Sequence, residues 1–258
     1  MLLNFNPEEL HNMIGRFRYE SEIFYGEVKG DRINVNRGLY SDTFLLSELQ
    51  LLPPTQPSKI ICVGLNYRDH ARELNMQVPD EPVLFLKPPS AVIGALGNII
   101  HPDTSDRVDY EGELAVIINK RCKNIKASEA RSVIMGYTCF NDVTARDLQK
   151  KDRQWTRSKS FDTFAPVGPY IASPEIDVSD LAIKTRVNGE LRQDSTTANL
   201  IFDVPYLIEF ITGVMTLERG DMIATGTPPG VGELMVGDVV EVEIEKIGAL
   251  KNNVIAHG

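Results

Sequence analysis

Two glutamates with one glycine between them stand directly before an apolar run. They are Glu111 and Glu113, and the sequence Leu-Ala-Val-Ile-Ile follows at 114–118. Residues two apart in extended chain point to the same face, so the two carboxylates share one side of the expected strand. Carboxylates held together repel one another unless one is protonated or a cation lies between them. Hard oxygen ligands favour magnesium, manganese or calcium over the metals that prefer thiolates.

A third carboxylate distinguishes this pair from the acidic run at 241–245, which alternates as the solvated face of a half-exposed strand. Asp142 ends the apolar run 137–143, where a carboxylate is costly unless it is paired or ligated. Lys87 also ends an apolar run, so it either reaches out to solvent or meets an anion. From spacing alone, a metal site and a structural hydrogen-bonded cluster are equally good interpretations.

The spacing of His70 and Glu73 fits an acid–base pair. Residues 66–74 have helical character, with Asp69 as the candidate N-cap. Residues three apart on a helix share a face, and a carboxylate on one imidazole nitrogen raises the basicity of the other. Such a histidine can take a proton from water. An ordinary surface His–Glu pair is the alternative, which spacing alone favours.

Cationic and turn residues supply candidate ligands for an anionic substrate. Arg146 and Gln149 follow Asp142 by four and seven residues, so a helix would stack all three on one side. Lys159 and Thr227, the latter in a turn rich in glycine and proline, could add contacts to a carboxylate beside a metal. For each residue taken singly, an exposed polar side chain is the alternative.

Composition narrows the functional class. The chain has 258 residues and a formal net charge of −9, and its basic residues cluster only at 150–159. Nucleic-acid binding is therefore not expected, whereas a small anionic ligand is. The three cysteines have no zinc or disulfide spacing, which fits a reducing compartment. Because the sequence shows neither a signal peptide nor an apolar stretch of membrane-spanning length, we expect a cytoplasmic protein without membrane contact.

Expected strands outnumber expected helices, which favours a β-rich α+β fold. Residues 1–56 resemble a small β-rich module that ends in a proline-rich linker, and residues 57–258 form the expected catalytic domain. Helices are predicted at 128–135, capped by Ser128, and at 202–212.

Several motifs together resemble the fumarylacetoacetate hydrolase family over residues 57–258. They are Gly-Leu-Asn-Tyr at 64–67 followed by His70 and Glu73, Phe-Leu-Lys-Pro at 85–88, Asp-Tyr-Glu-Gly-Glu-Leu at 109–114, Phe-Asn-Asp-Val-Thr-Ala-Arg at 140–146, Lys-Ser-Phe-Asp at 159–162, and Thr-Gly-Thr-Pro at 225–228. The resemblance implies the mixed β-roll of that family, a homodimer, and a lid that carries the acid–base pair.

The resemblance also assigns roles to individual residues. The ligands of Mg²⁺ or Mn²⁺ would be Glu111, Glu113 and Asp142. The catalytic residues would be His70, Glu73 and Lys159. The substrate contacts would come from Arg146, Gln149 and Thr227. Apart from these roles, we expect the pocket beyond the metal to be lined by the lid and by residues near Trp155 and Phe164.

The implied activity is metal-dependent cleavage or rearrangement of a small 2-oxo acid. The histidine–glutamate pair favours C–C bond hydrolysis of an acylpyruvate, because hydrolysis needs a base for water. The alternatives in the same family are oxaloacetate decarboxylation and the isomerisation and decarboxylation of 2-hydroxyhepta-2,4-diene-1,7-dioate or 5-carboxymethyl-2-hydroxymuconate. An alternative of another class is a metal-binding protein without catalysis.

Overall fold

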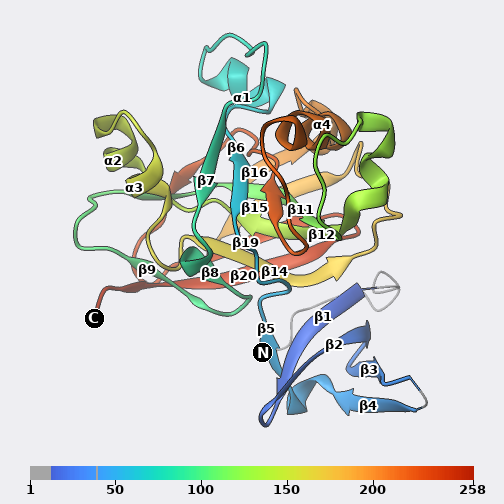
Figure 1. Ribbon diagram of the computed structural model, residues 1–258. Coiled ribbons are helices and arrows are strands. Elements are labelled where there is room, and N and C mark those ends of the chain that lie inside the picture. The colour runs from blue at the N-terminus through green and yellow to red at the C-terminus, as the bar shows by residue number, and fades with distance from the viewer. Residues whose placement is uncertain (1–12, 39) are drawn as a thin grey trace.

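The computed structural model describes residues 13–38 and 40–258, which form three β-sheets with short helices around them (Figure 1). The β-rich α+β fold predicted from the sequence is confirmed. The largest sheet has the order β4-β3-β2-β1-β14-β12-β11-β17-β6-β7, with β5 paired to β1 and β8 paired to β14. Its N-terminal strands are β1 (Met13–Tyr19), β2 (Glu22–Lys29), β3 (Arg32–Asn36), β4 (Ser41–Leu45) and β5 (Gln50–Leu52). Its other strands are β6 (Ile60–Val63), β7 (Leu84–Lys87), β8 (Val92–Ile93), β11 (Gly112–Ile118), β12 (Ile134–Asn141), β14 (Ala165–Ala172) and β17 (Met222–Ala224).

Two smaller sheets accompany the largest one. The five-stranded sheet has the order β16-β15-β19-β20-β9 and the three-stranded sheet the order β13-β10-β18. Their strands are β9 (Asn98–His101), β10 (Val108–Tyr110), β13 (Thr144–Ala145), β15 (Ala182–Val187), β16 (Glu190–Thr196), β18 (Gly232–Glu233), β19 (Val239–Ile244) and β20 (Gly248–Ala256).

Strand β11 is buried along its whole length, as its unbroken apolar run predicts. Because side chains alternate across a strand, Leu114 and Val116 join the cluster that includes Ile183 of the five-stranded sheet. Ala115 and Ile117 belong to a second apolar cluster on the other side. The acidic residues at the start of β11 are thus held by a rigid, doubly covered strand.

Strands β1 to β4 form an antiparallel meander at the lower edge of the molecule in Figure 1, away from α1. Phe17, Phe24 and Ile33 make its apolar cluster together with Tyr170 of β14. The predicted division at residues 56 and 57 falls between β5 and β6 and stays a prediction.

Short helices fill the connections between strands. They are α1 (Arg68–Glu73), α2 (Arg146–Lys151), α3 (Thr156–Lys159) and α4 (Val204–Val214), with the 3-10 helices η1 (Leu46–Glu48), η2 (Pro89–Ala91), η3 (Ala127–Val133) and η4 (Thr197–Asn199). The helix predicted at 202–212 is α4, capped by Asp203. The helix predicted at 128–135 is instead the 3-10 helix η3 with Lys126 at its N-cap, because the chain enters β12 at Ile134.

Gly136 in β12 marks a close approach to β14. A Cβ at this position would lie 2.1 Å from the Ala172 carbonyl oxygen and 2.6 Å from Ile171 Cγ2. We expect Gly136→Ala to lower the free energy of unfolding by about 1–3 kcal/mol through overpacking, measured by urea denaturation. The control is Gly213→Ala in α4, where a Cβ meets no atom within 4 Å, and which should raise stability by about 0.5–1 kcal/mol. Equal stability of the two variants would contradict the packing argument.

Candidate metal centre and active site

Three carboxylates meet where β11 begins and β12 ends. Glu113 lies in β11, Glu111 precedes it, and Asp142 follows β12 directly. The two strands are antiparallel, and the Asp142 N–H donates to the Glu111 carbonyl oxygen at 2.8 Å. One oxygen from each of the three side chains lies within 4.8 Å of the others, and all three residues are buried. The three carboxylates therefore form one compact cluster. Spacing alone had left open whether they make a metal site or a structural hydrogen-bonded cluster.

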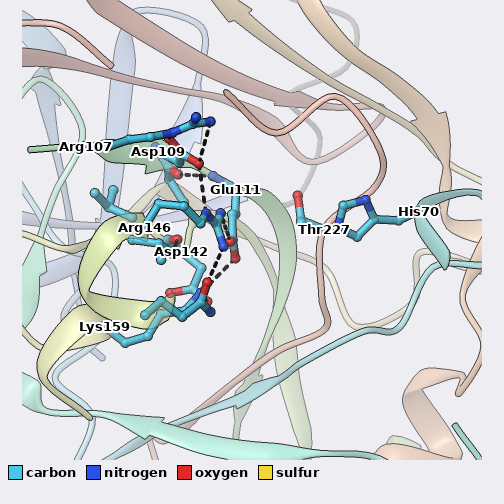
Figure 2. Close-up of polar contacts among 12 residues, drawn as sticks. His70, Arg107, Asp109, Glu111, Asp142, Arg146, Lys159 and Thr227 are labelled. Atoms are coloured by element: carbon cyan, nitrogen blue, oxygen red, sulfur yellow. Dashed lines mark hydrogen bonds and ion pairs between the residues drawn. The ribbon is translucent and has the colours of Figure 1, made fainter. Parts of the chain in front are cut away.

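Buried lysines neutralise part of this cluster. Lys159 Nζ lies 2.8 Å from Glu111 Oε2 and 2.6 Å from Asp142 Oδ2. Figure 2 shows Lys159 beside these two carboxylates. Lys87 Nζ donates to Asp142 Oδ1 at 2.5 Å, so this lysine meets an anion rather than solvent. Asp142 therefore pairs with both lysines, and Glu111 pairs with Lys159 and also with Arg146.

Glu113 differs from its neighbours. Within the described part of the chain its carboxylate accepts one hydrogen bond, from the Gly226 N–H at 2.8 Å, and forms no ion pair. Burial, followed by the negative charges of Asp142 and Glu111, raises the pKa of Glu113 well above its ordinary value. Burial alone would also raise the pKa of Glu111, but Lys159 and Arg146 lower it to about 2.

The donor set fits a hard divalent cation. A cation between the three carboxylates would give Glu113 the positive partner that the side chains around it do not supply. Two buried polar atoms have no hydrogen-bond partner among the described residues: Asn141 Nδ2, on the residue before Asp142, and Ser160 Oγ, on the residue after Lys159. Such atoms suit contacts with a hydrated ion or its ligand.

Helix α1 carries the predicted acid–base pair. His70 Nδ1 lies 2.8 Å from Glu73 Oε2, and Glu73 Oε1 accepts the Gly230 N–H at 3.0 Å. The carboxylate favours the proton on Nδ1, which leaves Nε2 as the basic nitrogen. Figure 2 shows the His70 ring turned toward Thr227, apart from the carboxylate cluster.

Asp69 anchors α1 instead of capping it. Tyr67 is at the N-cap position and makes no side-chain cap hydrogen bond, so the predicted cap is wrong. Asp69 Oδ2 accepts from Ser195 Oγ at 2.5 Å and from Asn199 Nδ2 at 3.1 Å, because its side chain faces the end of β16. These contacts fasten the helix that carries His70.

The structure corrects the predicted stacking of Asp142, Arg146 and Gln149. Asp142 precedes β13 and lies outside α2, which begins only at Arg146. Arg146 and Gln149 do share a side of α2, with Nη1 of the arginine 2.6 Å from Oε1 of the glutamine. Arg146 also donates to Glu111 and, through Nε at 2.8 Å, to Asp109.

Sequence reasoning missed two buried polar residues of the site. Asp109 accepts from both Arg107 and Arg146, and Gln193 donates to Thr227 Oγ1 at 2.8 Å. Asp109 stands within a quoted motif, whereas Gln193 lies in a strand that offers no motif at all.

Trp155 and Phe164, near which the pocket lining was predicted, lie in different surroundings. Phe164 is fully buried in a core cluster with Phe161, so it does not line a pocket. Trp155 is partly exposed and packs edge-on against Phe85, and the Phe85 ring lies 4.9 Å from Lys159 Nζ. Phe85 thus contacts the Lys159 ammonium, and Trp155 packs against the Phe85 ring.

The family model described as the C-terminal domain of fumarylacetoacetate hydrolase matches residues 59–255. The chain belongs to the fumarylacetoacetate hydrolase family. This confirms the resemblance drawn from the motifs. Within the described part of the chain, no helix combines the length and the apolar character that crossing a membrane requires.

Named members of the family differ in reaction. The mitochondrial oxaloacetate tautomerase FAHD2B of Bos taurus is 46% identical over 216 residues, 80% of this chain and 69% of the relative. The crystal structure of 5-carboxymethyl-2-hydroxymuconate delta-isomerase from Mycobacterium smegmatis has 42% identity and a TM-score of 0.89, covering 96% of this chain and 100% of that one. Maleylpyruvate hydrolase from Sphingobium sp. SYK-6, solved with manganese(II) and pyruvate, has 29% identity and a TM-score of 0.80, with coverage of 96% and 100%.

Replacing Glu113 by glutamine tests whether the cluster holds a metal. In metal-free protein the wild type should lose stability as pH rises above the ordinary carboxyl range, because folding favours the protonated form of a carboxyl with raised pKa. At pH 7 the metal-free variant should therefore be the more stable protein, by more than about 1 kcal/mol.

Saturating Mg²⁺ or Mn²⁺ should reverse this order, because binding to the folded state stabilises only a protein with an intact site. Urea denaturation at several pH values, with and without metal, measures both effects. The control is Glu243→Gln on a half-exposed strand. Equal metal stabilisation of wild type and Glu113→Gln would exclude Glu113 as a ligand.

Proposed function

We propose that the chain is a divalent-metal-dependent enzyme that converts a small 2-oxo acid through its enolate. The observation that carries the proposal is that one loop, 225–230, contacts both halves of the site. Its Gly226 N–H donates to Glu113 in the carboxylate cluster, and its Gly230 N–H donates to Glu73 of the acid–base pair. The proposed metal site and the proposed base are thereby both hydrogen-bonded to one short loop.

The proposed metal ligands are Glu111, Glu113 and Asp142, with Mg²⁺ or Mn²⁺ as the ion. When bound, the ion supplies Lewis acidity, which stabilises negative charge that develops on the carboxylate and 2-oxygen of a 2-oxo acid. The buried ammonium of Lys159 adds a fixed positive charge beside the same carboxylates.

Two groups of side chains then have different proposed roles: one orients the substrate, and the other transfers a proton. Arg146 and Gln149, adjacent on α2, offer donors to the substrate carboxylate. His70 Nε2 takes a proton from water, and Glu73 stabilises the imidazolium that results. That water attacks the distal carbonyl of an acylpyruvate, the C–C bond breaks, and the pyruvate enolate that leaves takes up a proton.

A second candidate is isomerisation at the same site. It is supported by the relatives named for tautomerase and isomerase activity, which are more similar to this chain than the maleylpyruvate hydrolase. In this reaction His70 moves a proton between carbon and oxygen, and water does not attack. Oxaloacetate decarboxylation needs no water nucleophile either. A homodimer and a cytoplasmic location stay predictions.

A panel assay on metal-stripped protein tests the proposed reaction. Mg²⁺ or Mn²⁺ is added back, and acetylpyruvate, fumarylpyruvate, oxaloacetate and a 2-hydroxymuconate-type diene acid are each followed by ultraviolet absorbance and by pyruvate release. We expect metal-dependent pyruvate release from an acylpyruvate. Turnover of oxaloacetate or the diene acid alone would assign the isomerase or decarboxylase reaction. If the protein binds metal but converts none of the four compounds, a non-catalytic metal-binding protein would be supported.

Replacing His70 tests the role of the base. We expect His70→Ala to lower kcat for acylpyruvate hydrolysis by about 10²–10⁴-fold, the usual contribution of a general base, while decarboxylation is largely retained. The control is His257→Ala, which removes an exposed histidine whose nearest acid, Asp103, is 3.7 Å away. Equal loss of both activities in His70→Ala would show that the pair does not generate the water nucleophile.

A further inference from the structure

Gln193 in β16 uses every hydrogen-bonding capacity of its side-chain amide. The residue is fully buried. Its Oε1 accepts from the Gly112 N–H at 3.0 Å and from Thr185 Oγ1 at 2.7 Å. Its Nε2 donates to Thr227 Oγ1 and to the Pro228 carbonyl oxygen, both at 2.8 Å. A fully satisfied buried amide of this kind holds its partners in one arrangement.

Backbone groups dictate which way this amide points. The Gly112 N–H can only donate, and the Pro228 carbonyl can only accept. Exchanging oxygen and nitrogen in Gln193 would set donor against donor at one end and acceptor against acceptor at the other. The NH₂ group must therefore face the loop 225–230.

Gly112, Gln193 and Thr227 are joined in a closed ring of three hydrogen bonds. The Gly112 N–H donates to Gln193, Gln193 donates to the Thr227 hydroxyl, and that hydroxyl donates to the Gly112 carbonyl oxygen at 2.9 Å. A hydroxyl has one hydrogen, and here it is committed to Gly112. The Thr227 side chain can then only accept further hydrogen bonds.

This ring of hydrogen bonds determines which group of Thr227 can donate to a bound anion. A carboxylate needs a donor, which the committed hydroxyl does not provide. The backbone N–H of Thr227 has no partner among the described residues, whereas the neighbouring Gly226 N–H is already used by Glu113. The amide N–H of Thr227 is therefore the donor left for substrate.

We propose that Gln193 is a positioning residue, which holds the Thr227 hydroxyl as an acceptor so that the loop binds the 2-oxo acid through the Thr227 backbone N–H. The inference rests on the proposed function and deepens it. Close packing supports it, because a Cβ on Gly230 would lie 2.2 Å from the Arg192 carbonyl oxygen, next to Gln193. The loop thus rests directly on β16.

Gln193→Glu tests this inference with almost no change in shape. One carboxylate oxygen keeps the contacts to Gly112 and Thr185, while the other no longer donates to Thr227 Oγ1 and brings an acceptor against the Pro228 carbonyl. Isothermal titration of pyruvate into Mn²⁺-loaded protein should show about tenfold weaker binding. The Kd of Mn²⁺ itself should change by less than about threefold, because no metal ligand bonds to Gln193.

A double-mutant cycle distinguishes positioning from a general structural role. Thr227→Val removes the hydroxyl of the ring, so adding Gln193→Glu to it should weaken pyruvate binding little further. The matched control is Thr185→Val, which removes only a contact to Oε1 and should leave the pyruvate Kd within about threefold of wild type. Thermal melts monitored by circular dichroism check that each variant folds.

The outcomes separate this inference from the proposed reaction. Additive losses in the cycle, or a Thr185→Val variant as weak as Gln193→Glu, would overturn the positioning role. A wild type that binds Mn²⁺ but not pyruvate would overturn it as well, whatever its turnover. A wild type that binds both yet converts no panel substrate removes the proposed reaction and leaves the role of Gln193 supported by its binding data.

Discussion

Buried negative charge at the junction of β11 and β12 is the constraint around which the site is built. Three carboxylates within 4.8 Å of one another cannot all remain ionised in a dry interior without cations. Lys87 at the end of β7 and Lys159 in α3 converge on Asp142 from elements far apart in the chain. Their charges balance part of the cluster and leave Glu113 for a proton or a metal ion.

The close packing of the five-stranded sheet against β11 and the placement of the two glutamates both depend on Gly112. Gly112 separates the two glutamates, and a Cβ there would lie 2.2 Å from Thr185 Oγ1 of the five-stranded sheet. The absent side chain leaves room for Thr185 and lets Gln193 Oε1 accept a hydrogen bond from the Gly112 N–H, while the Thr185 hydroxyl donates to the same Gln193 oxygen. Glu111 and Glu113 point to the opposite side of that contact because side chains alternate along a strand.

Residue spacing in the sequence correctly predicted the contacts between residues that are close together in the chain. The common face of Glu111 and Glu113 and the contact between His70 and Glu73 follow from strand and helix periods. The stacking of Asp142 over α2 was wrong, because the chain turns through β13 before the helix starts.

Partners distant in sequence were not predictable from spacing. Gln193 bonds to a backbone group 81 residues away, and Asp69 bonds to a side chain 126 residues away. No local pattern encodes such pairs, since they arise only when β16 packs against both β11 and α1. The family motifs contain the proposed metal ligands, the proposed base and the charged partners of the carboxylates, whereas Gln193 and Ser195, which bond to the loop and to Asp69, lie in no motif.

Strand β16 links the two chemical halves of the site. Gln193 and Ser195 are two residues apart on it; one bonds to the loop beside Glu113, and the other bonds to Asp69 at the start of the helix that carries His70. The separation between His70 and the carboxylate cluster is therefore fixed by a short piece of one strand, not by a flexible connection. In the proposed enzyme this frame would hold the bound 2-oxo acid and His70 in a constant relation, so that hydrolase and isomerase reactions could share it. Which of the proposed reactions follows would depend on whether a water molecule or a substrate carbon atom comes within reach of His70 Nε2.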